Sequence, residues 1–187
     1  MNKSLPTLMV MLLVIAGCAT MTTAEKEQKR SELNSMAEAA ISGLIEKDPE
    51  IQSEIEKSLG YAVANMKLTK VPIVGAGGGE GVFINKQTQH RTYFTVGRFD
   101  LGGGWGARSY KALIVFDSQD VMEKVEGGTW EFQAGAEASA GTAAAEGSTS
   151  DLNKGFTMHV LSDGGASATV TARVIRIKVN KKLMKDN

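Results

Sequence analysis

The residue with the clearest chemical role is Cys18, the only cysteine in a chain of 187 residues. An apolar run precedes it and ends in the small residues Ala16 and Gly17. This order is typical of a lipobox, in which the cysteine thiol is acylated and the chain is cut immediately before it. The pattern predicts that Cys18 becomes the first residue of the mature chain and carries the lipid. The alternative is an ordinary secretory signal in which Cys18 has no role.

The residues before Cys18 have the features of an export signal. Lys3 supplies the positive start and residues 5–15 the apolar stretch. This stretch is too short for a transmembrane helix, which needs ~20 apolar residues. We therefore predict a lipoprotein signal peptide over residues 1–17 and a tether over residues 18–24. Ala19 stands where an aspartate would favour the inner membrane, which indicates a lipid-anchored protein on the outer membrane, facing the periplasm.

Residues that could support catalysis or hold a cofactor are few. His90 and His159 lack the spacing of metal ligands, and the chain has no Gly-x-Ser-x-Gly nucleophile elbow. The glycine run 75–81 lacks the Lys-Ser/Thr ending of a phosphate-binding loop, and the run 102–107 continues into β-branched residues where a dinucleotide site needs a helix. We expect no enzyme activity, no metal and no cofactor. A hydrolase in which Glu80 or Glu137 meets another acid is the weakest alternative.

The charges of the chain balance, with 21 Lys and Arg residues against 21 Asp and Glu residues. A nucleic-acid-binding protein concentrates basic residues on one face, so we expect no nucleic-acid partner. Because Cys18 has no second cysteine to pair with, packing alone must stabilise the domain.

The elements that position these residues change type at Gly60. Apolar residues recur every three or four positions over residues 25–47, which predicts an amphipathic helix whose apolar stripe packs on the domain, and Pro49 begins a second helix that ends near Ser58. The rest is strand-like except for a short helix over residues 118–125. We predict strands over residues 61–68, 71–84, 91–99, 112–116, 129–139, 155–161 and 166–179, a turn at residues 163–165, and a frayed tail over residues 180–187.

Glycines occupy alternate positions of one predicted strand, at Gly75, Gly77, Gly79 and Gly81. Alternate residues share a face of a sheet, so these glycines make a strip of bare backbone against which something large must lie. We favour close packing in a small, strongly curved sheet over a ligand surface. The predicted fold class is α+β: N-terminal amphipathic helices over residues 25–58, then a glycine-rich, mainly antiparallel, curved or barrel-like β domain over residues 60–180 with one short helix. The single domain covers residues 25–187.

The order of these segments resembles the SYLF domain, a module of some eukaryotic membrane-trafficking and actin-associated proteins and of many bacterial lipoproteins. The resemblance covers some 130 residues from about Glu54, and its segments are LGYAVA (59–64), VGAGGGEGV (74–82), LGGGWGA (101–107), KALIVF (111–116) and WEFQAGAEASAG (130–141). It implies phospholipid binding. Many members carry Trp-Ser-x-Pro and Gly-Pro-x-Gly-Arg segments where this chain has RTYFT (91–95) and GTAAAEG (141–147), so the identity of the lipid does not carry over.

Together these features predict a non-enzymatic, membrane-anchored phospholipid-binding module. An indole ring suits the acyl boundary and cations suit the phosphate, so Trp105 is the candidate acyl-side contact. The candidate headgroup contacts are Lys67, Lys70, Arg91, Arg98, Arg108 and Lys111. For each, the alternative is an ordinary core or solvated side chain. The alternative function is an envelope scaffolding lipoprotein that docks a protein partner.

Overall fold

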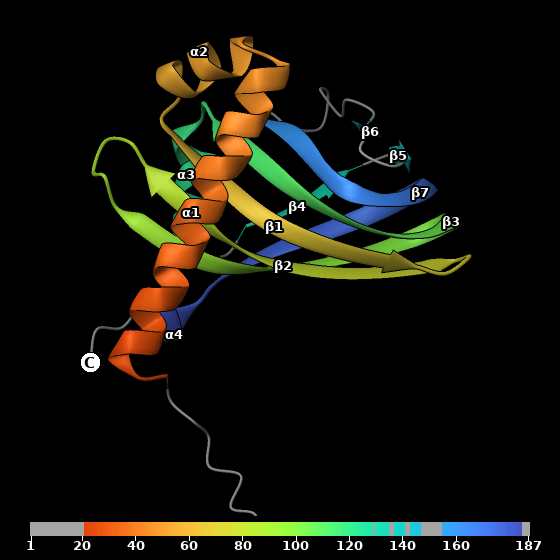
Figure 1. Cartoon of the computed structure of the whole chain (residues 1–187), viewed down its shortest axis with the longest axis horizontal. Coiled ribbons are helices and arrows are strands. Elements are labelled where there is room, and N and C mark those ends of the chain that lie inside the picture. Colours follow the sequence, from red (N-terminus) through yellow and green to blue (C-terminus); the bar gives the residue numbers. More distant parts are fainter. Residues whose placement is uncertain (1–20, 129, 135–136, 141–142, 147–154, 185–187) are drawn as a thin grey trace, which may run out of the picture.

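A computed structural model describes residues 21–128, 130–134, 137–140, 143–146 and 155–184 of the chain. The signal peptide and residues 18–20 of the tether, Cys18 included, lie outside the described residues, so the acylation of Cys18 stays a prediction. Figure 1 shows a long helix lying across a curved sheet, with shorter helices at its margins.

Four helices are described: α1 (Thr23–Lys47), α2 (Glu50–Lys57), α3 (Gln119–Glu126) and α4 (Lys181–Met184). The first three lie within two residues of their predicted bounds. At the start of α1, Thr22 and Glu25 form a capping box. The Thr22 N–H donates to the Glu25 carboxylate and lowers the pKa of that carboxyl, so this cap is lost as the pH falls. The predicted frayed tail is wrong over α4, because Leu183 packs in the core.

Seven strands form one sheet: β1 (Gly60–Lys70), β2 (Val74–Asn85), β3 (Arg91–Phe116), β4 (Glu131–Ala134), β5 (Glu137–Ala140), β6 (Ala143–Glu146) and β7 (Phe156–Val179). The strand order is β1-β2-β3-β7-β5-β6, with β4 also paired to β7, and every pairing is antiparallel. β2 pairs with the first half of β3 and β1 with the second half, so the three strands curl around a common interior. The predicted α+β class with a curved antiparallel sheet is confirmed.

Two predicted breaks in the strands are absent. Residues 91–99 and 112–116 belong to the single strand β3, which runs through the glycines between them, and the predicted turn at residues 163–165 lies inside β7. A bulge replaces that turn, since Ser109 pairs with Gly164 whereas Tyr110 pairs with Ser162. Conversely, the strand predicted over residues 129–139 is divided between β4 and β5. Glycines in β3 and β7 permit strong bending, which the sequence alone does not distinguish from a turn.

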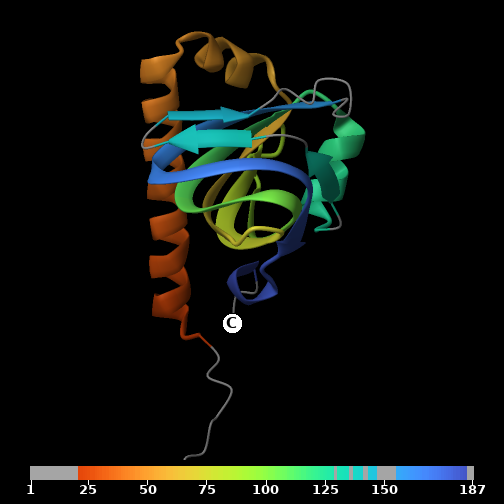
Figure 2. The ribbon, with the colours of Figure 1, turned by 90° about the vertical axis from the view of Figure 1, so that its right-hand side faces the viewer.

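The sheet separates two hydrophobic cores. The inner core fills the concave side with alternate residues of β1 and β3, including Met66, Leu68 and Phe94, and is closed by α3. The outer core lies under α1, where Leu33 and Leu44 pack against the opposite face of the sheet. Figure 2 shows the sheet curling between α1 on one flank and α3 on the other. This packing confirms that the apolar stripe of the first helix faces the domain.

The glycines of β2 allow the inner core to be filled. A Cβ atom on Gly79 would lie 2.2 Å from the Asn65 carbonyl oxygen, and one on Gly81 would lie 2.3 Å from the Val63 carbonyl oxygen and 2.6 Å from the Phe94 ring. These distances are far inside van der Waals contact. Close packing is therefore the reason for the glycines at these positions, as we predicted.

The glycine strip yields a matched pair of variants. Gly81→Ala should lower the free energy of unfolding by about 1–3 kcal/mol, because the methyl group overpacks the core. Gly97→Ala should change it by less than about 0.5 kcal/mol, because a Cβ atom there meets nothing within 4 Å. Urea denaturation measures both. Equal losses in the two variants would contradict the steric explanation.

Candidate functional site

The turn between β1 and β2 is apolar and exposed. Residues 71–74 read Val-Pro-Ile-Val, closed by a hydrogen bond of 3.0 Å from the Val71 N–H to the Val74 carbonyl. The Ile73 side chain is 70% exposed. Hairpin turns are normally built from Gly, Asn, Asp and Pro, which face water. A turn made of β-branched apolar residues therefore points to a surface that contacts something other than water.

The middle of β3 extends this apolar surface. The backbone register pairs Leu101 with Val74, and it places Gly106, the neighbour of Trp105, opposite Lys70 at the end of β1. Trp105 is the most exposed of these side chains, at 74%. All six large apolar side chains that are exposed in the described part of the chain gather at this end of the sheet, which Figure 1 shows at the right. We call them the apolar tip: Val71, Ile73, Val74, Phe99, Leu101 and Trp105.

Behind the apolar tip, the inner face of the sheet changes from apolar to charged. Nε and Nη2 of Arg98 donate to the two Asp100 carboxylate oxygens, each over 2.9 Å, and both side chains are fully buried. The Arg98 Nη1 donates over 2.6 Å to the Tyr110 hydroxyl, and the Arg108 guanidinium stacks 4.2 Å from the centre of the Tyr110 ring. Lys70, which is also buried, completes this buried charge cluster.

The buried charge cluster joins the two halves of β3. Arg98 lies on the half that pairs with β2, whereas Arg108 and Tyr110 lie on the half that pairs with β1. Bidentate hydrogen bonds fix the relative orientation of a guanidinium and a carboxylate more tightly than a single bond does. The cluster therefore holds the bend of β3, and with it the apolar tip, in a fixed shape. Among the described residues, the buried charge cluster contains three cationic side chains and one carboxylate.

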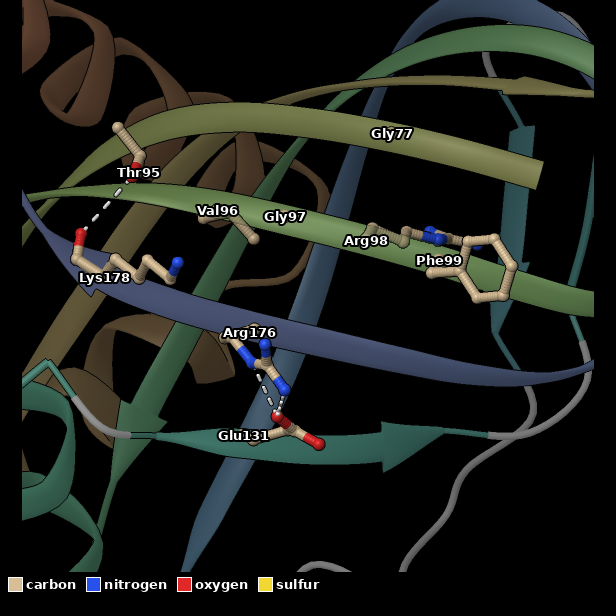
Figure 3. A pocket seen from close by; sticks show the side chains of 9 residues that line it. All are labelled: Gly77, Thr95, Val96, Gly97, Arg98, Phe99, Glu131, Arg176 and Lys178. Carbon is tan, nitrogen blue, oxygen red and sulfur yellow. Dashed lines mark hydrogen bonds and ion pairs between the residues drawn. The ribbon is translucent and has the colours of Figure 1, made fainter.

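An open groove lies on the outer face of the sheet, beside the tip. Its volume is about 690 Å³, and Figure 3 shows that it follows β3 between β2, β7 and β4. Gly97 forms part of the floor, and Arg176 pairs with Glu131 through two bonds of 2.7 Å. We call it the outer groove; its lining residues are Gly77, Thr95, Val96, Gly97, Arg98, Phe99, Glu131, Arg176 and Lys178.

The structure distributes the predicted site residues over several surfaces. Trp105 lies in the apolar tip, whereas Lys70, Arg98 and Arg108 lie beneath it in the buried charge cluster. The remaining candidates lie elsewhere: Lys67 and Arg91 are exposed, and Lys111 pairs with Asp163.

The two histidines and the acids considered for catalysis lie apart from the tip and the outer groove. His90 contacts Glu126 at 3.3 Å, and His159 contacts Glu54 at 2.6 Å, which joins β7 to α2. Glu80 pairs with Lys29 of α1 at 2.5 Å. The backbone register places Glu137 opposite Glu146.

Sequence reasoning missed most of the apolar tip and most of the outer groove; of the residues that line the groove, it singled out Gly77 and Arg98. The predicted strand over residues 71–84 included residues 71–73, which form the turn. Pro72 was the available signal, since proline is excluded from central strand positions. No local signal marks the outer groove, because its lining residues come from four strands that meet only in the folded sheet.

Comparisons with known proteins give a distant relative. No protein-family model matches the chain, so the SYLF resemblance stays a prediction. The chain is 25% identical over 139 residues to a protein called Beta cell expansion factor A from Aeromonas veronii, which is 74% of this chain and 52% of that protein. The chain thus spans about half the length of this curated relative.

Searches for two further features of the described residues are negative. None of the helices in this part of the chain has the length and hydropathy needed to cross a bilayer. The same residues contain no group of three or more His, Cys, Asp or Glu side chains that could hold a metal ion.

The buried charge cluster predicts an unequal response to single and double substitution. Asp100→Asn should lower the free energy of unfolding by about 3–5 kcal/mol, because Arg98 stays buried without this carboxylate. The double variant Arg98→Met/Asp100→Leu should lose less, since it removes both charges. Urea denaturation distinguishes the two. An Asp100→Asn protein as stable as the wild type would show that the pair does not hold the bend of β3.

Proposed function

We propose that this protein is a non-enzymatic, lipid-anchored phospholipid-binding module of the outer membrane, facing the periplasm, that contacts a bilayer through the apolar tip. The observation that carries the proposal is the gathering of every exposed large apolar side chain of the described residues at one rigid end of the sheet. Exposed apolar surface of this kind marks contact with a membrane or a protein. The SYLF resemblance, which implies phospholipid binding, favours the membrane.

The filled interior of the sheet favours surface contact over enclosure of a lipid. The cavity inside the curved sheet, lined by residues that include Met66, Tyr110 and Ile177, has a volume of only about 20 Å³. This is room for about one water molecule and lies far below the ~300 Å³ at which small-molecule sites begin. An acyl chain therefore has no room in this cavity, which favours contact between lipid and the outer surface of the protein.

The predicted acyl anchor and the apolar tip would act together. An acylated Cys18 would hold the chain at the membrane, and the apolar tip would add a second contact with the bilayer. Each large apolar side chain transferred from water into the bilayer contributes up to about 1.5–3 kcal/mol. Once Cys18 holds the chain at the membrane, the local concentration of the tip is high, so even weak tip affinity keeps it at the surface.

The tip would serve the alternative function of docking an envelope protein equally well, and crosslinking in cells together with vesicle binding separates the two. A scaffold should recover a defined partner after crosslinking in cells and be indifferent to vesicles. A lipid-binding module should bind vesicles made of purified lipid with no other protein present.

The first functional prediction concerns the tip. Every described element and core residue follows residue 20, so we use the protein that begins at Ala19, which lacks the anchor. Its binding to phosphatidylcholine–phosphatidylglycerol vesicles, measured by sedimentation, should fall at least about tenfold in Ile73→Glu/Trp105→Glu, because two large side chains no longer enter the bilayer.

The control introduces one negative charge at the other end of β1, away from the tip. Ser53 is exposed on α2, and β1, which follows α2, spans about 33 Å from that end to the tip. Ser53→Glu should bind vesicles like the wild type. Loss of binding in both proteins, or no vesicle binding by the wild type, would contradict the proposal.

The second functional prediction concerns the anchor. Mass spectrometry of the protein extracted from native membranes should show a mature chain that begins at an acylated Cys18. Cys18→Ala should yield an unacylated chain that retains residues 1–17, since the cut at a lipobox follows acylation of this thiol. An unmodified Cys18 in membrane-extracted protein would refute the lipobox interpretation.

A further inference from the structure

The outer groove is the strongest unassigned feature of the molecule. Its volume of about 690 Å³ lies within the range of ~300–1,000 Å³ typical of small-molecule sites. The four strands β2, β3, β7 and β4 contribute one row of paired residues across it: Gly78, Gly97, Arg176 and Glu131. Gly97 leaves a bare floor, since a Cβ atom there would meet nothing within 4 Å. A ligand can therefore approach the backbone closely at this row.

The groove changes from cationic to apolar along β3. On the side away from the tip, Thr95 pairs with Lys178 in the register, and Arg176 follows opposite Gly97. On the side toward the tip, Phe99 forms the wall, and Leu101 of the apolar tip continues the same face of β3. Figure 3 shows the Lys178 side chain toward one end of the groove, Arg176 near its middle and the Phe99 ring at the other end. This gradient matches an amphiphile lying along the strand.

The charges of the groove favour an anionic group. Arg176 and Lys178 face solvent, and Glu131 is the only carboxylate among the residues that line the groove. The Arg176–Glu131 pair is exposed, with 60% and 40% of the two side chains accessible. Exposed pairs of this kind contribute only about 0–1 kcal/mol, so a phosphate can take over hydrogen bonds from Glu131 at little cost. Arg binds phosphate through two parallel N–H bonds, and Lys adds a point charge.

The position of the cations fits the depth of a lipid headgroup. Phe99 and Gly97 are two residues apart on β3. Their depths in the membrane therefore differ by at most about 7 Å, whatever the tilt of the strand. Arg176 is paired with Gly97. The headgroup layer of one leaflet is ~5–8 Å thick, from the difference between total and hydrocarbon thickness. With Phe99 at the edge of the hydrocarbon, Arg176 lies at the level of the phosphates.

We infer that the outer groove binds one anionic glycerophospholipid, with its phosphate on Arg176 and Lys178 and its acyl chains directed over Phe99 toward the apolar tip. This inference rests on the proposed membrane function and specifies the lipid class and the headgroup site. The predicted headgroup residue Lys67 is not among the residues that line the groove.

The test uses the protein that begins at Ala19 and two kinds of probe. Monomeric dihexanoyl phosphatidylglycerol should shift the amide NMR resonance of Gly97, whereas inorganic phosphate and glycerophosphate, which lack acyl chains, should bind at least about tenfold more weakly. Arg176→Gln and Lys178→Gln should each weaken the short-chain lipid about fivefold. Gly97→Leu should block it, because the new side chain rises into the groove from a floor position where a Cβ atom meets nothing within 4 Å.

Lys57→Gln is the matched control, because it removes one exposed cation from α2, outside the outer groove. This variant should bind the short-chain lipid like the wild type. The groove variants should bind phosphatidylglycerol-containing vesicles more weakly than the wild type does. Their loss of affinity for pure phosphatidylcholine vesicles should be smaller.

The outcomes separate the inference from the proposed function. Wild-type protein that binds no vesicle of either composition refutes both. A second outcome is that vesicle binding by the wild type depends on Ile73 and Trp105, but the groove variants bind the short-chain lipid as the wild type does. These variants are Arg176→Gln, Lys178→Gln and Gly97→Leu. That outcome refutes the groove site and leaves the proposed function standing. Equal affinity for inorganic phosphate and the short-chain lipid would show a free-anion site and also refute the inference.

Discussion

The architecture depends on one steric constraint, which is that strand β2 offers bare backbone to the inside of a tightly curved sheet. Carbonyl oxygens of β1 and the Phe94 ring of β3 occupy the space that side chains at Gly79 and Gly81 would take. β1 therefore pairs with β2 on one side and with β3 on the other while large residues still fill the interior. The small radius of the sheet and its nearly filled core follow from this constraint.

The strong curvature of the sheet changes which residues can occupy the inward positions at its open end. Inward positions near the hairpin turn no longer lie in the apolar core, and Lys70, Arg98, Asp100 and Arg108 occupy them. Because the Arg98–Asp100 pair and the Tyr110 hydroxyl satisfy one another inside the bend, outward positions can carry apolar residues without collapsing inward. The buried charges and the exposed apolar tip are two sides of the same bent strand.

The proposed membrane contact divides its chemistry between two surfaces. The apolar tip supplies affinity for hydrocarbon, and the outer groove supplies exposed cations at the depth of the phosphates. Three cations that the sequence suggested for headgroup contact, Lys70, Arg98 and Arg108, lie below the surface and shape the tip. Arg176 and Lys178, which the sequence did not single out, are the cations that face outward beside it.

Local signals in the sequence determined the first three helices, the α+β class and the close packing at the glycines of β2, because helical periodicity and strand alternation are properties of neighbouring residues. They did not determine that β3 and β7 are continuous, since glycine marks a bend and a turn alike. Only the tertiary structure brought the turn of residues 71–74 beside Leu101, buried Arg98 and placed Arg176 next to Gly97. Those relations depend on register between strands distant in the chain, and register is fixed by the packing of the whole sheet.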